Sequence, residues 1–255
     1  MTINSYYRQE WAPPGVDPDV FEKGLGEWLE TAAKNSLDRL IQSPATLSGQ
    51  DAILLNYIEL QRIRVPRQSE AAKELTRQTL LQLFPSDIAD TVRVGEMELT
   101  INDSARFDYM RILTGKLYPW FMRMEWEIYE AGKGSAFITT DSPVSLHNAD
   151  VLPPDEPGVA LAGTKVFFPL SSRYALLMRH PEIRRAPSIS RLAVLPNPPV
   201  EGARLSITRG VTWESRVVNN FNRKMVLLSN RFVVGESKET LEACTTMRKE
   251  SHNAA

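Results

Sequence analysis

The stretch MEWEIY, residues 124–129, marks the point where the spacing of apolar residues changes along the chain. Upstream of it, apolar residues recur every three or four positions, as on one face of an α-helix. Within it, Met124, Trp126 and Ile128 alternate with polar neighbours, as in a strand with one solvated face. Helical patterns come first and strand patterns follow. This order predicts an α+β fold, in which an N-terminal helical half packs on a C-terminal, mostly antiparallel sheet.

Four helices are predicted before this point. The first begins at Asp17-Pro18, an N-cap residue followed by a proline at the first helical position, and extends to about Ile41. The other three are predicted at about 49–65, 68–84 and 104–123. Pro66 should end or kink the second of them, because proline removes a helical hydrogen bond. Between the last two, residues 86–103 alternate like a short hairpin.

The C-terminal half is predicted to be rich in strands. After the glycine-containing turn EAGKGSA, residues 136–140 should return as a strand beside 124–129. Further strands are predicted at 164–170, 173–179, 189–195, 203–208 and 231–237, with a helix at about 211–229 after Gly210. No linker separates the halves, so a single domain is predicted over 1–255, with a helical part at about 17–123, a β-rich part at about 124–237 and a frayed tail at 238–255.

Composition and charge exclude several classes of protein. The formal net charge is −1, so no global field attracts nucleic acid or an anionic membrane, and no apolar run approaches the roughly 20 residues that span a bilayer. The single cysteine, Cys244, excludes an internal disulfide framework and a cysteine-rich zinc site. These features predict a cytoplasmic protein, with no membrane partner and nucleic acid a minority alternative.

The familiar catalytic motifs are absent from the sequence. It contains no G-x-G-x-x-G, no G-x-x-x-x-G-K-[ST], no H-E-x-x-H and no G-x-S-x-G. With only three histidines, a multi-histidine metal centre is not expected, and the prediction for metal ligands is none. A triad of Asp141, His147 and either Ser142 or Ser171 can be written down, but nothing in the spacing favours it.

The helix predicted over 49–65 carries polar residues on its apolar stripe. Stepping by three and four from Ile53 reaches Gln61 and Arg64, whereas Arg62 points off the stripe. An inward guanidinium needs a carboxylate, a carbonyl or a bound anion, because an unpaired buried charge costs several kcal/mol. The alternative is that the helix emerges at the surface there and Arg64 extends into solvent.

Three further polar residues are candidates for a site. Asp141 follows the strand FITT and precedes Pro143. It either forms a local Asx-turn or faces Arg64, an anionic ligand or a bound metal. Ser171 lies in the tight connection of FFPLSSRYALLM, which is first of all a hairpin turn but could also present its hydroxyl to a ligand. Asn220 lies within a helix, where asparagine is mildly disfavoured, and this hints at a hydrogen-bonding role.

Several segments in this order resemble the uncharacterised bacterial DUF4238 family. The matching stretches are LQRIRVPR, FITTDSPV, FFPLSSRYALLM, EWLETAAKNSLDRL and NNFNRKMVLLSNRFVV, which together span about 20–237. The resemblance implies a site at the positions that match the family pattern, namely Glu30, Gln61, Arg64, Asp141, Pro143, Pro169, Ser171 and Asn220. The chain starts with SYYRQEWAPPG where the family has a His-Tyr-Val-Pro element, which suggests an N-terminally shortened member.

The sequence leaves two function classes open. The favoured one is a binding or regulatory protein for a small molecule or macromolecule, with a polar cluster at the helix–sheet junction that includes Gln61, Arg64, Asp141, Ser171 and Asn220. The alternative is a hydrolase or nuclease of a bacterial accessory system, in which Asp141 is a metal ligand or general base and Arg64 and Glu30 are its neighbours. Enzymatic activity, cofactor and protein partner remain undetermined by the residues.

Overall fold

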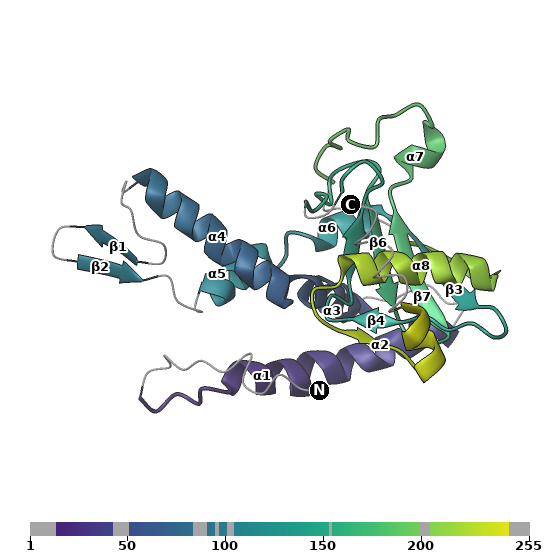
Figure 1. The fold of residues 1–255 in the computed structure, drawn as a ribbon, viewed down its shortest axis with the longest axis horizontal. Helices are drawn as coiled ribbons and strands as arrows, with labels where there is room; N and C mark the ends of the chain where they lie inside the picture. The colour runs from purple at the N-terminus through teal and green to yellow at the C-terminus, as the bar shows by residue number, and fades with distance from the viewer. Residues whose placement is uncertain are drawn as a thin grey trace.

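A five-stranded sheet lies at the centre of the protein. The computed structural model describes residues 14–42, 51–83, 91–94, 97–100, 105–152, 155–198 and 205–244. In this sheet the strands lie in the order β5-β6-β7-β3-β8 (Figure 1). Their bounds are Glu125–Ala131 for β3, Ser145–His147 for β5, Lys165–Pro169 for β6, Tyr174–Arg179 for β7 and Ser206–Trp213 for β8. All neighbours are antiparallel except β3 and β8, which are parallel. The predicted α+β fold is confirmed.

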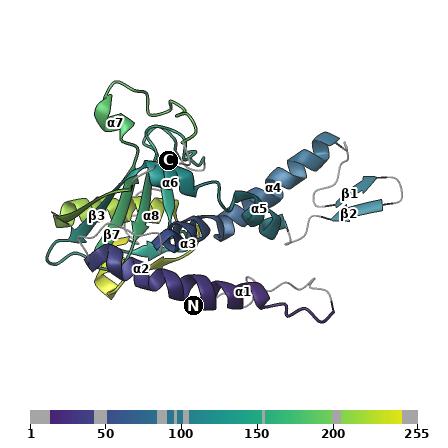
Figure 2. The same cartoon turned by 180° about the vertical axis from the view of Figure 1, so that it is seen from behind.

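Helices cover both faces of this sheet (Figures 1 and 2). On one face, Trp126 and Ile128 of β3 pack in a buried cluster with α2 (Thr31–Gln42), α3 (Ala52–Ile63) and α6 (Tyr118–Arg123). On the other face, α8 (Ser215–Leu228) presents Val218, Phe221 and Met225 to a second buried cluster. Each strand of the central β3–β7 pair therefore buries both of its faces.

The remaining helices extend from this body. The first predicted helix is continuous through α1 (Val20–Gly24), the π-helix η1 (Leu25–Glu30) and α2. Pro66 begins α4 (Pro66–Leu83), as expected for a proline that ends the preceding helix. The predicted hairpin is confirmed as β1 (Thr91–Val94) and β2 (Met97–Thr100), which lies at the far end of the molecule, near the outer end of α4 (Figure 1). α5 (Ala105–Leu113) packs against α4. The helix predicted over 104–123 is broken between α5 and α6, where Gly115 has a φ of 84°.

The strand predicted over 136–140 does not pair with β3. Only β4 (Thr139–Thr140) is a strand there, and it pairs antiparallel with β9 (Val233–Val234) in a separate two-stranded sheet. The reason is that β3 already has a neighbour on each side, β7 and β8, so no edge of it remains for a returning strand. The chain after β3 therefore crosses to the C-terminal segment instead.

The strand before α8 is longer than predicted and contains Gly210. Gly210 does not directly precede the helix but lies within β8, with a φ of 81°, where the register to β3 shifts between Glu127 and Tyr129. A glycine of positive φ suits such an irregularity, because the backbone can change direction without a Cβ clash. The helix predicted from about 211 consequently begins at Ser215.

The strand predicted over 189–195 is wrong. The segment follows the short helix α7 (Glu182–Arg185) and forms only an isolated bridge from Val194 to Leu161. Its apolar residues instead pack as a loop, with Leu195 buried beside Trp120 and Ala162. β5 was not predicted. It is three residues long and therefore too short to show an alternating pattern.

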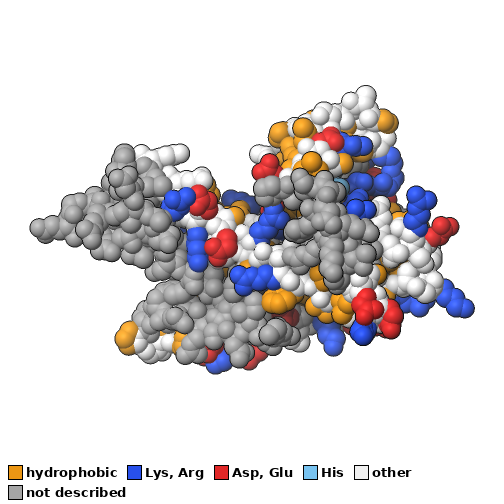
Figure 3. Space-filling model, in the orientation of Figure 1, with side chains coloured by type: hydrophobic (Ala, Val, Ile, Leu, Met, Phe, Trp, Pro, Cys, Tyr) orange, Lys and Arg blue, Asp and Glu red, His pale blue; other side chains and the backbone are white. Residues whose placement is uncertain are grey.

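The described surface has mixed charge. In Figure 3, acidic and basic side chains are interspersed around the sheet body, and Lys and Arg side chains gather between α8 and α7. No helix among the described residues is long and apolar enough to cross a bilayer.

Candidate functional site

A pocket of about 400 Å³ lies where α2 and α3 meet the end of the β6–β7 hairpin. Its apolar lining includes Leu37, Phe137, Ile138, Phe168, Leu170 and Val234. Its polar lining comprises Tyr57, Gln61, Thr139, Ser171, Ser172 and Glu236. Side chains far apart in sequence thus converge here, from helices, sheet and the segment after β9. An apolar hollow with a few polar groups is the usual form of a small-molecule site.

The wall from α3 combines a buried amide with a phenol. Tyr57 and Gln61 are four residues apart, so they lie one turn apart on the same side of the helix. Gln61 is buried, as its place on the apolar stripe predicted. Burial raises the pKa of Tyr57, while the charge of Arg64 and a hydrogen bond with Gln61 oppose that change. The Tyr57 hydroxyl is therefore neutral at physiological pH and available as a hydrogen-bonding group.

Arg64 and Glu30 form an ion pair beside this wall. Arg64 Nη1 donates to Glu30 Oε1 at 2.6 Å, which links the end of α3 to η1. Their side chains are 18% and 43% exposed, respectively, so Arg64 is turned inward but not sealed from solvent. The structure thus brings together two of the predicted catalytic candidates. Their charges compensate each other next to Tyr57.

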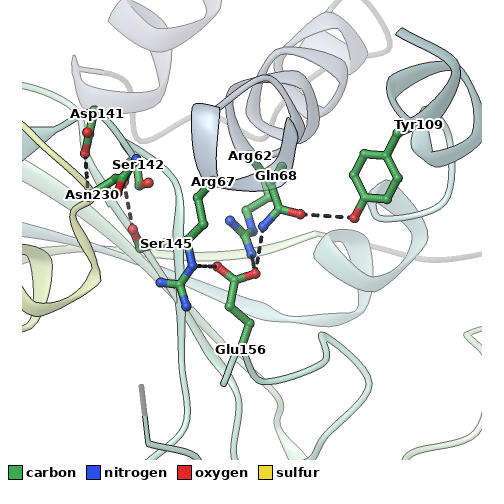
Figure 4. A network of polar contacts seen from close by, with 9 residues as sticks. All are labelled: Arg62, Arg67, Gln68, Tyr109, Asp141, Ser142, Ser145, Glu156 and Asn230. Carbon is green, nitrogen blue, oxygen red and sulfur yellow. Dashed lines mark hydrogen bonds and ion pairs between the residues drawn. The ribbon is translucent and has the colours of Figure 1, made fainter. Parts of the chain in front are cut away.

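The carboxylate of Asp141 binds backbone rather than Arg64. It accepts the N–H of Asn230 at 2.9 Å (Figure 4). It also accepts the N–H groups of Arg231 and Phe232, at 2.5 and 3.2 Å, respectively. The predicted pairing with Arg64 is therefore wrong, and so is the Asx-turn. Instead of Asp141, Thr140 Oγ1 accepts the N–H of Ser142. Asp141 ties the chain after β4 to the chain before β9, two segments that continue into the pocket lining.

Two prolines and a serine of the family pattern also line the pocket. These are Pro143, Pro169 and Ser171. Ser171 Oγ accepts the N–H groups of Arg173 and Tyr174 at 3.2 and 3.1 Å, so the predicted hairpin turn is present. Its hydroxyl proton is not used by these two bonds. Ser171 therefore shapes the turn and still has a donor for the pocket.

Of the comparisons with known proteins, the one with family models gives a match. The family model for DUF4238, described as a protein of unknown function, matches residues 2–239. The chain belongs to the DUF4238 family. No curated protein and no solved structure matches it significantly. Four of the eight positions named for the family resemblance, Gln61, Pro143, Pro169 and Ser171, line the one pocket described above.

In this DUF4238 protein the structural asparagine of α8 is Asn222 rather than Asn220. Asn220 is exposed and does not line the pocket. Asn222 is buried; its Oδ1 accepts the N–H of Ile138 at 3.2 Å and its Nδ2 donates to the carbonyl of Ala136 at 2.8 Å. The helical period could have found it, since Asn222 lies four residues after Val218 on the buried stripe.

Replacing Asn222 with alanine should lower the free energy of unfolding by about 1–3 kcal/mol, because the N–H of Ile138 and the carbonyl of Ala136 would be left without their partner in a buried site. Asn220→Ala is the matched control on the same helix and should leave stability within about 0.5 kcal/mol of the parent. Urea titration of both variants measures the difference. Equal destabilisation of the two would refute the assignment.

A second polar cluster joins α3 and α4 to the loop before β6 (Figure 4). Glu156 of that loop pairs with Arg62, which is buried, and with Arg67 at 3.4 Å. Gln68 Nε2 donates to Glu156 Oε2 at 2.7 Å, and Tyr109 donates its hydroxyl proton to Gln68 Oε1 at 3.0 Å. The prediction that Arg62 points away from the core is wrong.

The error about Arg62 has a structural cause. The periodic pattern of α3 predicts a single buried stripe of ordinary width. In this family member α3 packs against α2 and α6 and also against α5, so its buried arc is wider and includes Arg62, four residues after Ile58. Among the described residues, no group of three or more His, Cys, Asp or Glu side chains is arranged to hold a metal ion.

Proposed function

We propose that this DUF4238 protein binds a small molecule in the pocket lined by Gln61. The observation that carries the proposal is the convergence of four family-pattern positions on one hollow of about 400 Å³. This volume falls within the range of about 300–1,000 Å³ that small-molecule sites occupy.

The lining defines the chemical class of the ligand. Most of the wall is aliphatic or aromatic, and Gln61 offers both a donor and an acceptor. Among the described residues of the lining, Glu236 is the charged one, and the Arg64 charge nearby is compensated by Glu30. The pocket therefore suits a compact, neutral molecule with an apolar ring or chain and an amide or hydroxyl group. Among the described lining residues, an anion would meet the carboxylate of Glu236 and no cation.

The arrangement supports binding over the hydrolase or nuclease alternative. A general base must have a lone pair within reach of a substrate proton. Both carboxylate oxygens of Asp141 already accept backbone N–H groups, and Glu30 is paired with Arg64. The proposal includes a cytoplasmic location, which the single cysteine, a buried free thiol, supports.

Gln61→Leu tests this function. We expect the variant to fold with a free energy of unfolding lowered by no more than about 1–3 kcal/mol, because the partly buried Tyr57 hydroxyl loses its hydrogen bond with Gln61. A panel of neutral aromatic and alicyclic amides and alcohols, with benzamide and cyclohexanol as its simplest members, should raise the melting temperature of the parent. The variant should bind the same compounds at least about tenfold more weakly, which corresponds to one lost hydrogen bond of about 1.4 kcal/mol.

The control for this test is Gln78→Leu, which alters an exposed glutamine of α4 outside the pocket. It should respond to the compounds as the parent does. A panel that stabilises the parent and Gln61→Leu equally, or stabilises neither, would overturn the proposal.

A further inference from the structure

The face of the sheet under α8 carries a separate group of basic side chains. Lys165 begins β6, whereas the pocket lies beyond the other end of that strand. Lys165 and Phe167 project to the same face, because side chains two apart in a strand do so. His147 of β5 is the register partner of Lys165, and Lys224 of α8 reaches the same place.

One aromatic ring holds this group together. The Phe167 ring has the His147 ring at its edge, 5.6 Å between centroids, and the Lys224 ammonium 5.6 Å from its centroid. His147, Lys165 and Lys224 are all partly buried. Figure 3 shows Lys and Arg side chains gathered on this side of the molecule, between α8 and α7. The sheet therefore presents two ammonium groups and an imidazole at one spot beside its buried core.

The acidic side chains nearby are already engaged elsewhere. Glu127 pairs with Arg179, the register partner of Lys165 on β7, and with Arg184. Glu125, the register partner of Arg179 on β3, also pairs with Arg184, at 3.1 Å. Among the residues that the structure describes, no carboxylate pairs with Lys165 or Lys224 and no hydrogen bond involves their ammonium groups; Lys224 has the Phe167 ring as its contact. Positive charge is thus in excess at this spot, although the whole chain has a formal net charge of −1.

Gathering like charges in a partly buried place costs free energy in the absence of a ligand. Burial, and then the charges of Lys224, Arg179 and Arg191, lower the pKa of Lys165 despite an opposing effect of Glu127. Burial, and then Lys224 and Lys165, lower the pKa of His147 to about 4. A bound anion would remove this repulsion.

We infer that His147, Lys165 and Lys224 form a binding site for the phosphate group of a small molecule. A phosphate dianion matches two ammonium groups that have no carboxylate, whereas a carboxylate would neutralise only one of them. The site is distinct from the pocket at Gln61, and it does not depend on the function proposed for that pocket. The group is also too compact, and the whole chain too near neutrality, for an extended nucleic acid backbone.

Lys165→Met tests the inference, because it removes the charge and keeps an apolar stem of similar length. Without phosphate, the variant should melt at the same temperature as the parent or higher, since repulsion is relieved. In inorganic phosphate or glycerol phosphate, against sodium chloride at equal ionic strength, the parent should gain stability and the variant should bind at least about tenfold more weakly. Arg223→Met, at an exposed position of α8, is the matched control and should keep the response of the parent.

The His147 resonance gives a second readout by NMR. The pKa of His147 should rise from about 4 in the parent when phosphate binds, and it should also rise in Lys165→Met without phosphate. If Lys165→Met does not fold, Lys224→Met replaces it. Binding of the monoester as well as inorganic phosphate would identify an esterified ligand, and binding of inorganic phosphate alone would identify the free ion. Equal stabilisation of parent and Lys165→Met, a response to DNA alone, or no response at matched ionic strength would overturn the inference.

Discussion

Glu156→Ala is expected to lower the free energy of unfolding by about 3–5 kcal/mol, because it would leave a buried guanidinium without its counter-charge. The Arg62 side chain is 7% exposed and pairs with Glu156, and the same carboxylate accepts from Gln68. Removing the carboxylate therefore also leaves the Gln68 amide without an acceptor. Denaturant titration at pH 7 measures the loss.

Two further variants separate the effect of the Glu156 charge from the effect of altering this loop. Asp155→Ala changes the neighbouring, exposed acid and should leave the unfolding midpoint unchanged. Glu156→Gln keeps an oxygen acceptor for Gln68 but removes the charge, so it should lie between the parent and Glu156→Ala. A loss below about 1 kcal/mol for Glu156→Ala would show that solvent already satisfies Arg62.

The same pair should make stability depend on pH in the acidic range. Burial raises the pKa of Glu156. The charges of Arg62 and Arg67, together with hydrogen bonds from Arg62 and Gln68, lower it by a larger amount, so that the pKa lies below its usual value of 4.5. A carboxyl with a depressed folded pKa binds a proton more readily when unfolded, so its stabilisation is complete above the unfolded pKa. The stability difference between parent and Glu156→Gln should therefore shrink as the pH falls below about 4.5.

Asp141→Asn is expected to lower the free energy of unfolding by about 2–3 kcal/mol, the scale of hydrogen bonds to a charged group. The carboxylate accepts three backbone N–H groups, from Asn230, Arg231 and Phe232. In asparagine an NH2 group, which donates and cannot accept, replaces one of the two acceptor oxygens. Amide hydrogen exchange at 230–232 should accelerate in the variant. Asp150→Asn is the control, because Asp150 is exposed and its carboxylate pairs with the exposed side chain of Arg191 at 3.3 Å. Unchanged exchange at 230–232 would contradict the assignment.

The parts of the fold that follow from local periodicity were predicted from sequence. β6 and β7 are apolar runs bounded by turn residues, and α3 has a clear stripe, so their positions follow from short windows. The partner of β4 does not, because its pairing with β9 depends on which edges of β3 are occupied. The start of α8 does not follow from a short window either, because a glycine such as Gly210 can mark the boundary of an element or an irregularity inside a strand.

For the candidate site, too, local patterns identified some residues, whereas their long-range partners could not be predicted. Gln61 was identified by its position on a stripe, and Ser171 by its turn. Arg64 pairs with a carboxylate, as its place on the stripe predicts, but that carboxylate is Glu30, 34 residues earlier in the chain, and not Asp141. The backbone partners of Asp141 are 89 to 91 residues away, and no local pattern could supply them. The burial of Arg62 likewise required knowledge of the helices around α3.

The central claim, that the pocket lined by Gln61 binds a compact neutral molecule, is tested most directly by NMR titration of the parent with the amide and alcohol panel. The claim predicts that binding compounds shift the Gln61 side-chain amide and the backbone amide of Thr139, both in the pocket lining. Thr139→Phe, which places a ring in the pocket, should fold and lose these shifts. Shifts that map outside the lining, that persist in Thr139→Phe, or that no panel compound produces would contradict it.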